Sequence, residues 1–204
     1  MLSGRPTLTR VLCILHFALG IAAAGCGAAP PTSAASGVGD WVAFQGEFRS
    51  VSGATETRGR VYRRGDGSFR KETLDVVGVP AFITIENRVK KAFYSYSGGG
   101  WTAQPWLGAP PPRPDASRYP NAAPQAERVA GFRVVRWDTA WGVLTLRAPE
   151  LDYYPLLEEH PYPPLRIRYV SVTRKDPADS LFEPPPGSQV DDLPWEYRGP
   201  LPLQ

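Results

Sequence analysis

Side chains that could carry out catalysis are few in this chain of 204 residues. It contains two cysteines and two histidines, and His160 is the only histidine after residue 16. His160 stands between Glu159 and Pro161, a setting in which an imidazole is more often solvated than used as a general base. The sequence contains neither a Gly-x-Ser-x-Gly nucleophile motif nor a glycine-rich phosphate loop. We therefore predict a protein that is not an enzyme and that needs no cofactor.

Two pairs of adjacent acids, Glu158-Glu159 and Asp191-Asp192, are the remaining groups with possible chemistry. Carboxylate oxygens are ligands for hard cations, but a site needs several of them in one geometry. We predict no metal site, because neighbouring acids in loops are usually solvated. The two catalytic carboxylates of a glycosidase can lie far from each other in the sequence. A hydrolase therefore stays open as the alternative to a protein without catalytic activity.

Cys26 has the most distinctive surroundings of any reactive residue. Arg5 and Arg10 precede an apolar run at 11–24, and the small residues at 23–25 come directly before Cys26. A basic start, a short apolar run and small residues at its end are typical of a secretory signal. A membrane-spanning helix needs roughly 20 apolar residues, more than this run supplies, so a retained anchor is the weaker alternative. We therefore predict a signal peptide over residues 1–25.

Small residues followed by a cysteine resemble the lipobox of bacterial lipoproteins, in which the cysteine becomes the acylated first residue of the mature protein. The resemblance implies that Cys26 carries lipid, such as palmitate, and anchors the protein to a membrane of the cell envelope. Gly27 stands where an Asp is linked to retention in the inner membrane, so the outer membrane, facing the periplasm, is the expected location. Ordinary secretory cleavage at Ala22-Ala23-Ala24 is the alternative, which would give a soluble secreted or periplasmic protein.

Removal of the signal would also remove Cys13, leaving Cys26 as the only cysteine and no intramolecular disulfide. Residues 27–39 are small and polar with two prolines, which is typical of a flexible tether; 13 such residues span roughly 20 Å. The net charge is +3, from 23 basic and 20 acidic residues. The basic residues are dispersed, so the sequence does not indicate a nucleic-acid partner.

From Trp41 onward the dominant pattern is alternation of apolar and polar residues, which indicates half-buried strands. Asp66-Gly67 and Asn87-Arg88 are candidate hairpin turns. A proline-rich loop is expected at 108–124 and a short helix at 148–160. These patterns predict an antiparallel all-β domain over 40–190 with little helix, followed by an extended proline-rich tail over 191–204. The expected strands are 41–49, 57–64, 68–74, 81–86, 89–96, 101–106, 127–137, 141–147 and 165–174.

Several motifs, taken in order, resemble the LolA/LolB-like family of periplasmic lipoprotein carriers and sorting proteins, including its uncharacterised lipoprotein members. The similarity covers most of residues 41–190 and implies a strongly curved, unclosed half-barrel sheet around an apolar cavity. This chain has the proline-rich loop where the family has lid helices, and Ser188 where an aromatic residue often follows the last glycine. The motifs are GSFRKE at 67–72, ITIEN at 83–87, AFYSY at 92–96, WGVLTLRAPEL at 141–151 with YPL at 154–156, and LFEP at 181–184 with Gly187.

Aromatic side chains on the expected strands are the candidate ligand-binding residues. The resemblance implies the cavity, and aromatic residues are suited to line a pocket for an apolar or amphipathic ligand. The predicted ligand is a lipid or the acyl chains of a lipoprotein. The alternative is that these side chains fill the core, in which case the protein is a structural or sensory lipoprotein that acts through protein partners. The candidates are Phe44, Phe48, Phe82, Tyr94 and Tyr96.

Overall fold

The computed structural model describes residues 41–106 and 112–192. The predicted signal peptide, Cys26, the tether and the tail beyond residue 192 lie outside the described residues. Within them, the helical elements are single 3-10 turns: η1 (Ala116–Arg118), η2 (Pro149–Leu151) and η3 (Asp179–Phe182). The described part of the chain has no helix long and apolar enough to cross a membrane.

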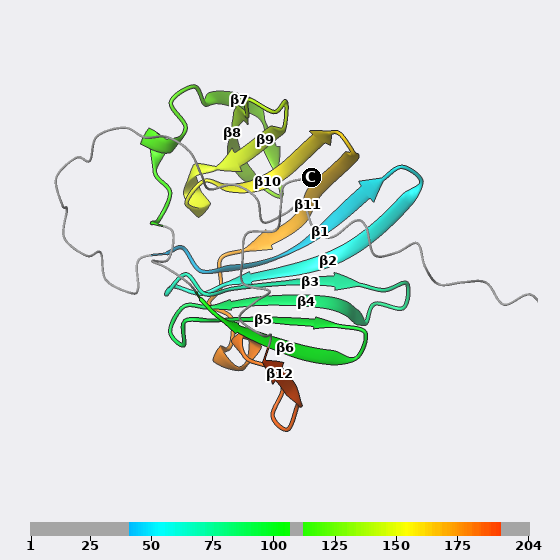
Figure 1. Cartoon of the computed structure of the whole chain (residues 1–204). Helices are drawn as coiled ribbons and strands as arrows, with labels where there is room; N and C mark the ends of the chain where they lie inside the picture. Colours follow the sequence, from blue (N-terminus) through cyan, green and yellow to red (C-terminus); the bar gives the residue numbers. More distant parts are fainter. Residues whose placement is uncertain (1–40, 107–111, 193–204) are drawn as a thin grey trace, which may run out of the picture. The chain divides into compact units, whose positions relative to one another are not determined.

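The described residues form twelve strands in one sheet, with the order β12-β6-β5-β4-β3-β2-β1-β11-β10-β9-β8-β7 (Figure 1). Neighbouring strands are antiparallel except β12 and β6, which run parallel. The two end strands, β12 and β7, do not pair, so the sheet is not closed. This confirms the predicted all-β, mainly antiparallel, unclosed half-barrel with little helix. The strands are β1 (Phe44–Ser52), β2 (Thr55–Arg63), β3 (Phe69–Leu74), β4 (Pro80–Asn87), β5 (Ala92–Ser97), β6 (Gly100–Pro105), β7 (Ala123–Val129), β8 (Phe132–Asp138), β9 (Leu144–Ala148), β10 (Tyr154–Pro161), β11 (Pro164–Thr173) and β12 (Val190–Asp192).

A ring contact between distant strands shows that the sheet curls strongly. Tyr154 of β10 and Phe69 of β3 lie four strand steps apart in the sheet order. Four steps across a flat sheet measure about 19 Å, because neighbouring strands are about 4.8 Å apart. The two ring centroids are nevertheless 5.9 Å apart. The face that carries both rings is therefore the concave face, and the other face is convex.

The predicted alternation holds on the central strands. Phe44 and Phe48 of β1 point to the concave face and are buried, whereas Glu47 and Arg49 between and after them are exposed. On β11, Ile167 is likewise buried on the concave side. On β1 and β11, one side of the strand faces the core and the other faces water, as alternation predicts.

Buried apolar residues form two separate clusters. The large cluster surrounds Phe44, Phe48 and Tyr169 on the concave side and extends to β8–β10 and η2. The small cluster consists of Ile83, Ile85, Trp101 and Phe182. Register places the small cluster on the convex face: Phe69, on the concave face, pairs with Glu86, and Ile85 next to Glu86 points the opposite way. Phe182 belongs to η3, which packs against β3 and β4 from the convex side.

The predicted single strand over 127–137 is wrong, because this segment is the hairpin of β7 and β8. Ala130 and Gly131 form its turn with φ of 48° and 85°. Two consecutive positive φ angles are the geometry of a type I′ turn, whose twist matches that of the flanking strands. Gly131 was the available turn signal in the sequence.

The predicted helix over 148–160 is also wrong. The helical part is limited to η2, and Asp152 and Tyr153 end it with φ of 54° and 55°. Strand β10 follows, with an irregular register at Pro155. Proline has no N–H to donate within a helix, whereas a bulge in a strand tolerates it.

Strand boundaries shift at both ends of the domain. β1 begins at Phe44 rather than at Trp41, and β5 begins at Ala92 because residues 88–91 form the turn before it. At the other end, Asp191 and Asp192 belong to β12, two residues beyond the expected end of the domain. The chain therefore returns to the sheet where an extended tail was expected.

Candidate functional site

Two of the predicted ligand-binding residues lie inside the filled large cluster. Phe44 is 0% exposed and Phe48 is 3% exposed. The Phe44 ring packs on Tyr154 with centroids 4.9 Å apart, and the Phe48 ring packs on Tyr169 at 5.6 Å. The hydroxyl oxygens of Tyr154 and Tyr169 are 2.6 Å apart, within hydrogen-bond distance. Phe44 and Phe48 therefore face packed side chains, and around them the filled-core alternative describes the molecule.

A buried ion pair closes one end of the large cluster. Arg63 Nη2 donates to Asp152 Oδ2 at 2.7 Å and to the Leu151 carbonyl oxygen at 2.9 Å. Burial lowers the pKa of Arg63 to about 10, and the Asp152 charge works against that shift. Asp152 also pairs with Arg113 and accepts the backbone N–H of Val42. This network fixes the segment that enters β1, and its hydrogen bonds are made within the protein.

Polar side chains on the concave face also have partners within the protein. Lys71 Nζ lies 5.0 Å from the centroid of the Phe48 ring, and burial lowers the pKa of Lys71. Burial opposes ionisation of Glu158, but the hydrogen bond from His160 and the charge of Lys71 outweigh it and lower the pKa of Glu158. His160 Nε2 lies 3.3 Å from Glu158 Oε2. His160 is therefore half-buried against Glu158, whereas a solvated side chain was expected.

The other three candidates are divided between the two faces. Phe82 is half-buried on the concave face, where it pairs with Thr73 of β3, and it belongs to neither apolar cluster. Tyr94 and Tyr96 point to the convex face and pack against the small cluster. The five predicted residues therefore do not form one site.

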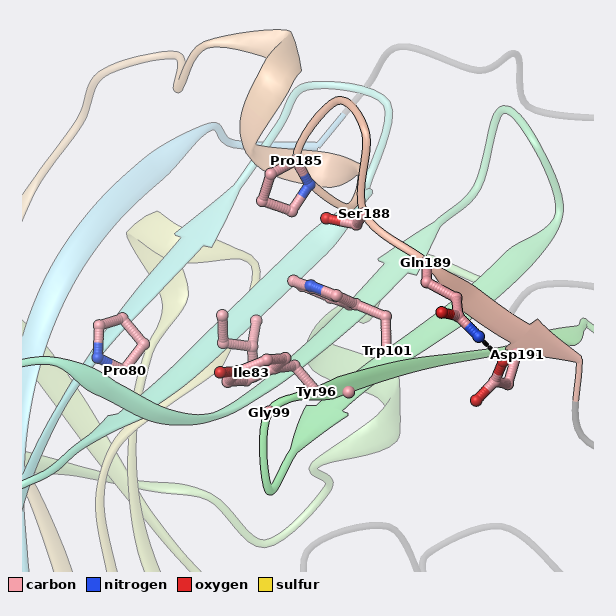
Figure 2. Close-up of a pocket in the computed structure, with 10 residues that line it drawn as sticks. Pro80, Ile83, Tyr96, Gly99, Trp101, Pro185, Ser188, Gln189 and Asp191 are labelled. Atoms are coloured by element: carbon pink, nitrogen blue, oxygen red, sulfur yellow. Dashed lines mark hydrogen bonds between the residues drawn. The ribbon is translucent and has the colours of Figure 1, made fainter.

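A pocket lies on the convex face, where Tyr96 and Trp101 meet the segment that follows η3 (Figure 2). Its volume is about 570 Å³. Binding sites for small ligands typically enclose about 300 to 1,000 Å³. The pocket is lined by Pro80, Ile83, Tyr96, Gly99, Gly100, Trp101, Pro185, Ser188, Gln189 and Asp191.

Cross-strand register builds the floor of the pocket. Tyr96 of β5 pairs directly with Ile83 of β4 and with Trp101 of β6, so the three side chains form one row on the convex face. The Tyr96 and Trp101 rings are in contact, with centroids 5.3 Å apart. Directly paired residues in a sheet point to the same side, and aromatic pairs add stability there.

Buried hydrogen bonds hold the opposite wall of the pocket in place. Arg70 Nη1 donates to the Leu181 carbonyl oxygen at 2.8 Å, and Asn87 Nδ2 donates to the Phe182 carbonyl oxygen at 3.0 Å. These bonds attach η3 to β3 and β4. The chain then passes through Pro185 and Ser188, which line the pocket, and forms β12 beside β6.

The pocket combines an apolar floor with a polar rim. Ser188, Gln189 and Asp191 are the polar lining residues, and Gln189 Nε2 donates to Asp191 Oδ1 at 3.3 Å (Figure 2). Val190 pairs with Trp101 and Asp191 with Thr102, so the Asp191 side chain points to the face opposite to that of Trp101. Asp191 is the one charged residue among the described residues that line the pocket. No group of three metal-ligating side chains occurs in the described ranges. The arrangement suits an amphipathic molecule, with its apolar part on the aromatic rings and its polar part at the rim.

Tyr96 is the one predicted ligand-binding residue that lines this pocket. Sequence reasoning missed Ile83 and Trp101, although register would have aligned both with Tyr96 once the β4–β5–β6 hairpins were placed. It also missed Ser188 and Asp191, because nothing in the sequence pattern indicates that the tail pairs with β6. Two signals were available at these positions: the unusual Ser188 after Gly187 and the adjacent acids Asp191-Asp192.

No protein-family model matches this chain, and no curated protein matches it. Three solved structures are similar to it in fold. An uncharacterized conserved protein from Thermus thermophilus is 13% identical with a TM-score of 0.49, covering 74% of this chain and 91% of that chain. MucB in the MucA/MucB complex of Pseudomonas aeruginosa is 15% identical with a TM-score of 0.42, covering 74% of this chain. A LolA superfamily protein from Nitrosomonas europaea is 8% identical with a TM-score of 0.35, covering 70% and 90%.

A LolA superfamily protein is among the solved structures that this chain is similar to. The chain spans 58% of the length of the MucB chain in the MucA/MucB complex. At these identities and TM-scores, the likeness carries no conclusion about ligands or partners.

Proposed function

We propose that this protein is an envelope lipoprotein, anchored through Cys26, that binds an apolar or amphipathic ligand without catalysing a reaction. The pocket between β4–β6 and the segment at 185–191 carries the proposal, because its volume and lining suit a small ligand or a short segment of a larger one. The predicted site around Phe44 and Phe48 is filled by protein side chains. The proposed ligand site is therefore on the convex face.

The chemistry of the lining supports an amphipathic ligand. Ile83, Tyr96 and Trp101 offer an apolar floor, and removing apolar area from water favours binding by about 25 cal/mol per Å². Ser188 and Gln189 at the rim offer hydrogen-bonding groups that orient a polar end. Lipids, acyl chains of lipoproteins and apolar peptide segments all belong to this ligand class.

A neutral amphipathic dye such as Nile red tests the pocket without assuming one class of ligand. We expect the full chain to bind the dye with a rise in fluorescence. Tyr96→Ala should weaken binding about tenfold, since the lost ring contact and buried area correspond to roughly 1.4 kcal/mol. Trp141→Ala is the matched control, because Trp141 is 88% exposed in the turn between β8 and β9 and does not line the pocket. Absence of dye binding, or equal weakening by both substitutions, would contradict a ligand site in this pocket.

The proposed anchor has its own test. Lipoprotein processing supplies more than one acyl chain, and multiple chains bind a membrane firmly where a single chain binds marginally. Cys26→Ser should therefore move the protein from the membrane fraction to the soluble fraction, while Cys13→Ser, inside the predicted signal, should leave it in the membrane. If the Cys26→Ser protein still pellets with membranes after a high-salt wash, lipid anchoring at Cys26 is wrong. Fractionation of inner and outer membranes then tests the proposed outer-membrane location.

A structural or sensory role through protein partners is the second candidate. The observation that favours it is the filled large cluster, which leaves no open space around Phe44 and Phe48. This candidate predicts a stable copurified protein and no dye binding at the convex pocket.

A further inference from the structure

Three arginine side chains lie next to one another across the central strands. Arg49 of β1 pairs directly with Arg168 of β11 on one side and with Arg58 of β2 on the other. Directly paired residues point to the same side of a sheet. Since Phe48 points to the concave face, its neighbour Arg49 and the other two arginines point to the convex face. We call these three residues the arginine row, and Figure 1 shows the strands that carry it side by side.

The row carries more positive charge than its acidic partners neutralise. Arg49 Nη1 lies 3.5 Å from Glu56 Oε1, and both side chains of this pair are about half exposed. Exposed pairs of this kind contribute little to stability. Within the described residues, Arg58 and Arg168 form no ion pair. Three cations therefore share one carboxylate.

Basic residues on either side of the row do have acidic neighbours. Arg60 is the direct partner of Glu47 in the register, and its Nη1 lies 3.9 Å from Glu72 Oε2. Arg166 Nε lies 3.0 Å from Glu159 Oε1. The excess of positive charge is therefore in the row itself.

The arrangement of the row favours a bound anion. Like charges directly opposite each other destabilise a sheet, so the row costs the free protein stability that an anion would restore. Guanidinium groups bind phosphate oxygens through paired N–H donors. The row extends over two strand spacings, about 10 Å, so it can contact more than one phosphate group.

Apolar side chains beside the row indicate what carries these phosphates. Val51, two residues after Arg49 and about 7 Å further along β1, is 40% exposed on the same face. Tyr162, in the turn between β10 and β11, is 91% exposed. A hydrogen bond from Ser52 Oγ to the Pro164 carbonyl oxygen, at 3.1 Å, joins this turn to β1. A tyrosine beside basic strands suits a membrane interface, where the ring meets lipid and the hydroxyl meets water.

We infer that this end of the sheet docks on a bilayer that contains anionic phospholipids. The arginine row contacts the lipid phosphates, and Val51 and Tyr162 enter the head-group region beyond them. Burial of apolar side chains and attraction to anionic lipids both strengthen such binding. This surface includes neither the convex pocket nor Cys26, so its binding is independent of the proposed function.

Vesicle flotation tests the inference. The full chain with Cys26→Ser is used, because acyl chains at Cys26 would hold every variant on the membrane. We expect tighter binding to mixed vesicles of phosphatidylcholine and phosphatidylglycerol than to pure phosphatidylcholine. Arg58→Gln and Arg168→Gln should each weaken binding to the mixed vesicles about fivefold and leave binding to pure phosphatidylcholine unchanged. Arg128→Gln is the matched control, because Arg128 is exposed on the edge strand β7, four strands from β11.

Two further measurements separate a binding role from a structural one. Arg168→Gln removes one of the adjacent like charges, so its melting temperature should equal or exceed that of the wild type while its binding falls. Arg58→Lys keeps the charge and should keep most of the binding that Arg58→Gln loses. A lower melting temperature of Arg168→Gln, or equal loss of binding in the two Arg58 variants, would overturn the role of the row.

Hydrogen exchange of the vesicle-bound chain locates the contact independently of residues 1–25, whose apolar run can itself bind vesicles. Mixed vesicles should slow amide exchange at 51–55 and 162–166, and pure phosphatidylcholine should not. Equal slowing by both vesicles, no slowing at these residues, or equal effects of Arg58→Gln and Arg128→Gln on flotation would overturn the inference. Binding of tripolyphosphate at the row without vesicle binding would also overturn it, because the row would then belong to a soluble polyanion.

Discussion

The large and small clusters differ because they lie on opposite faces of a curled sheet. Curling brings the concave side chains of distant strands together, so that Tyr154 of β10 contacts Phe69 of β3 and fills the interior. On the convex face the same curling spreads side chains apart. Ile83 and Trp101 there need η3 and β12 to cover them. Side chains of the sheet's own strands fill the concave face around Phe44 and Phe48, whereas the convex pocket lies where an added segment meets the sheet.

Glycines show the same difference. A Cβ at Gly59 on the concave face would overlap the Phe48 ring and the Glu72 carbonyl oxygen, so the close packing of Phe48 requires a residue without a side chain. At Gly99 and Gly100, which line the convex pocket, no atom lies within 4 Å of a Cβ position. The concave face is packed to contact around Phe48, and the pocket has room.

The largest expected effect is the loss of stability on truncating Phe48. Phe48→Ala should lower the free energy of unfolding by about 3 to 5 kcal/mol, because it leaves a cavity in the filled cluster. Tyr96→Ala should cost clearly less, since Tyr96 already borders open space. Urea unfolding followed by circular dichroism measures both. Equal costs, or a Phe48→Ala protein as stable as the wild type, would remove the distinction between the two faces.

A smaller effect is expected from releasing the segment that covers the convex face. Asn87→Ala removes the buried hydrogen bond to the Phe182 carbonyl oxygen, and an unpaired buried acceptor costs about 1 to 3 kcal/mol. Amide hydrogen exchange should accelerate at residues 181–190, with β1 and β2 little changed. Uniform acceleration over both faces would show that the small cluster does not open separately.

The smallest expected effect depends on pH and concerns Glu86, on the concave face outside the large cluster. Burial raises the pKa of Glu86 above its ordinary value of 4.5, and the Arg88 charge opposes the shift. A carboxyl whose pKa is raised by folding stabilises the folded state through its protonated form. This contribution to the free energy of unfolding is full below the unfolded-state pKa, and it is lost as pH rises through the folded-state pKa. Glu86→Gln should therefore raise the melting temperature near neutral pH and have little effect below about pH 4. A lower melting temperature of the variant at neutral pH would contradict the shift.

The strands, and which side chains share a face of each strand, were largely predictable from the local sequence pattern. The alternation around Phe44 and Phe48, and that around Ile167, determined which side chains are buried. The Gly65-Asp66-Gly67 turn was visible because glycine accepts the positive φ that it needs. The β7–β8 hairpin was missed because Ala130-Gly131 was passed over within one expected strand, and β10 was missed because its bulge disrupts the period of two.

The sequence by itself determined the all-β class and the alternating faces of the central strands, because these depend on neighbours in the chain. Only the tertiary structure decided which face is concave, which aromatic residues are packed and where space remains. Those outcomes depend on contacts between strands far apart in the sequence, such as Tyr154 with Phe69 and β12 with β6. Alternation assigns a side chain to a face, and the direction in which the sheet curls then decides whether that face is filled.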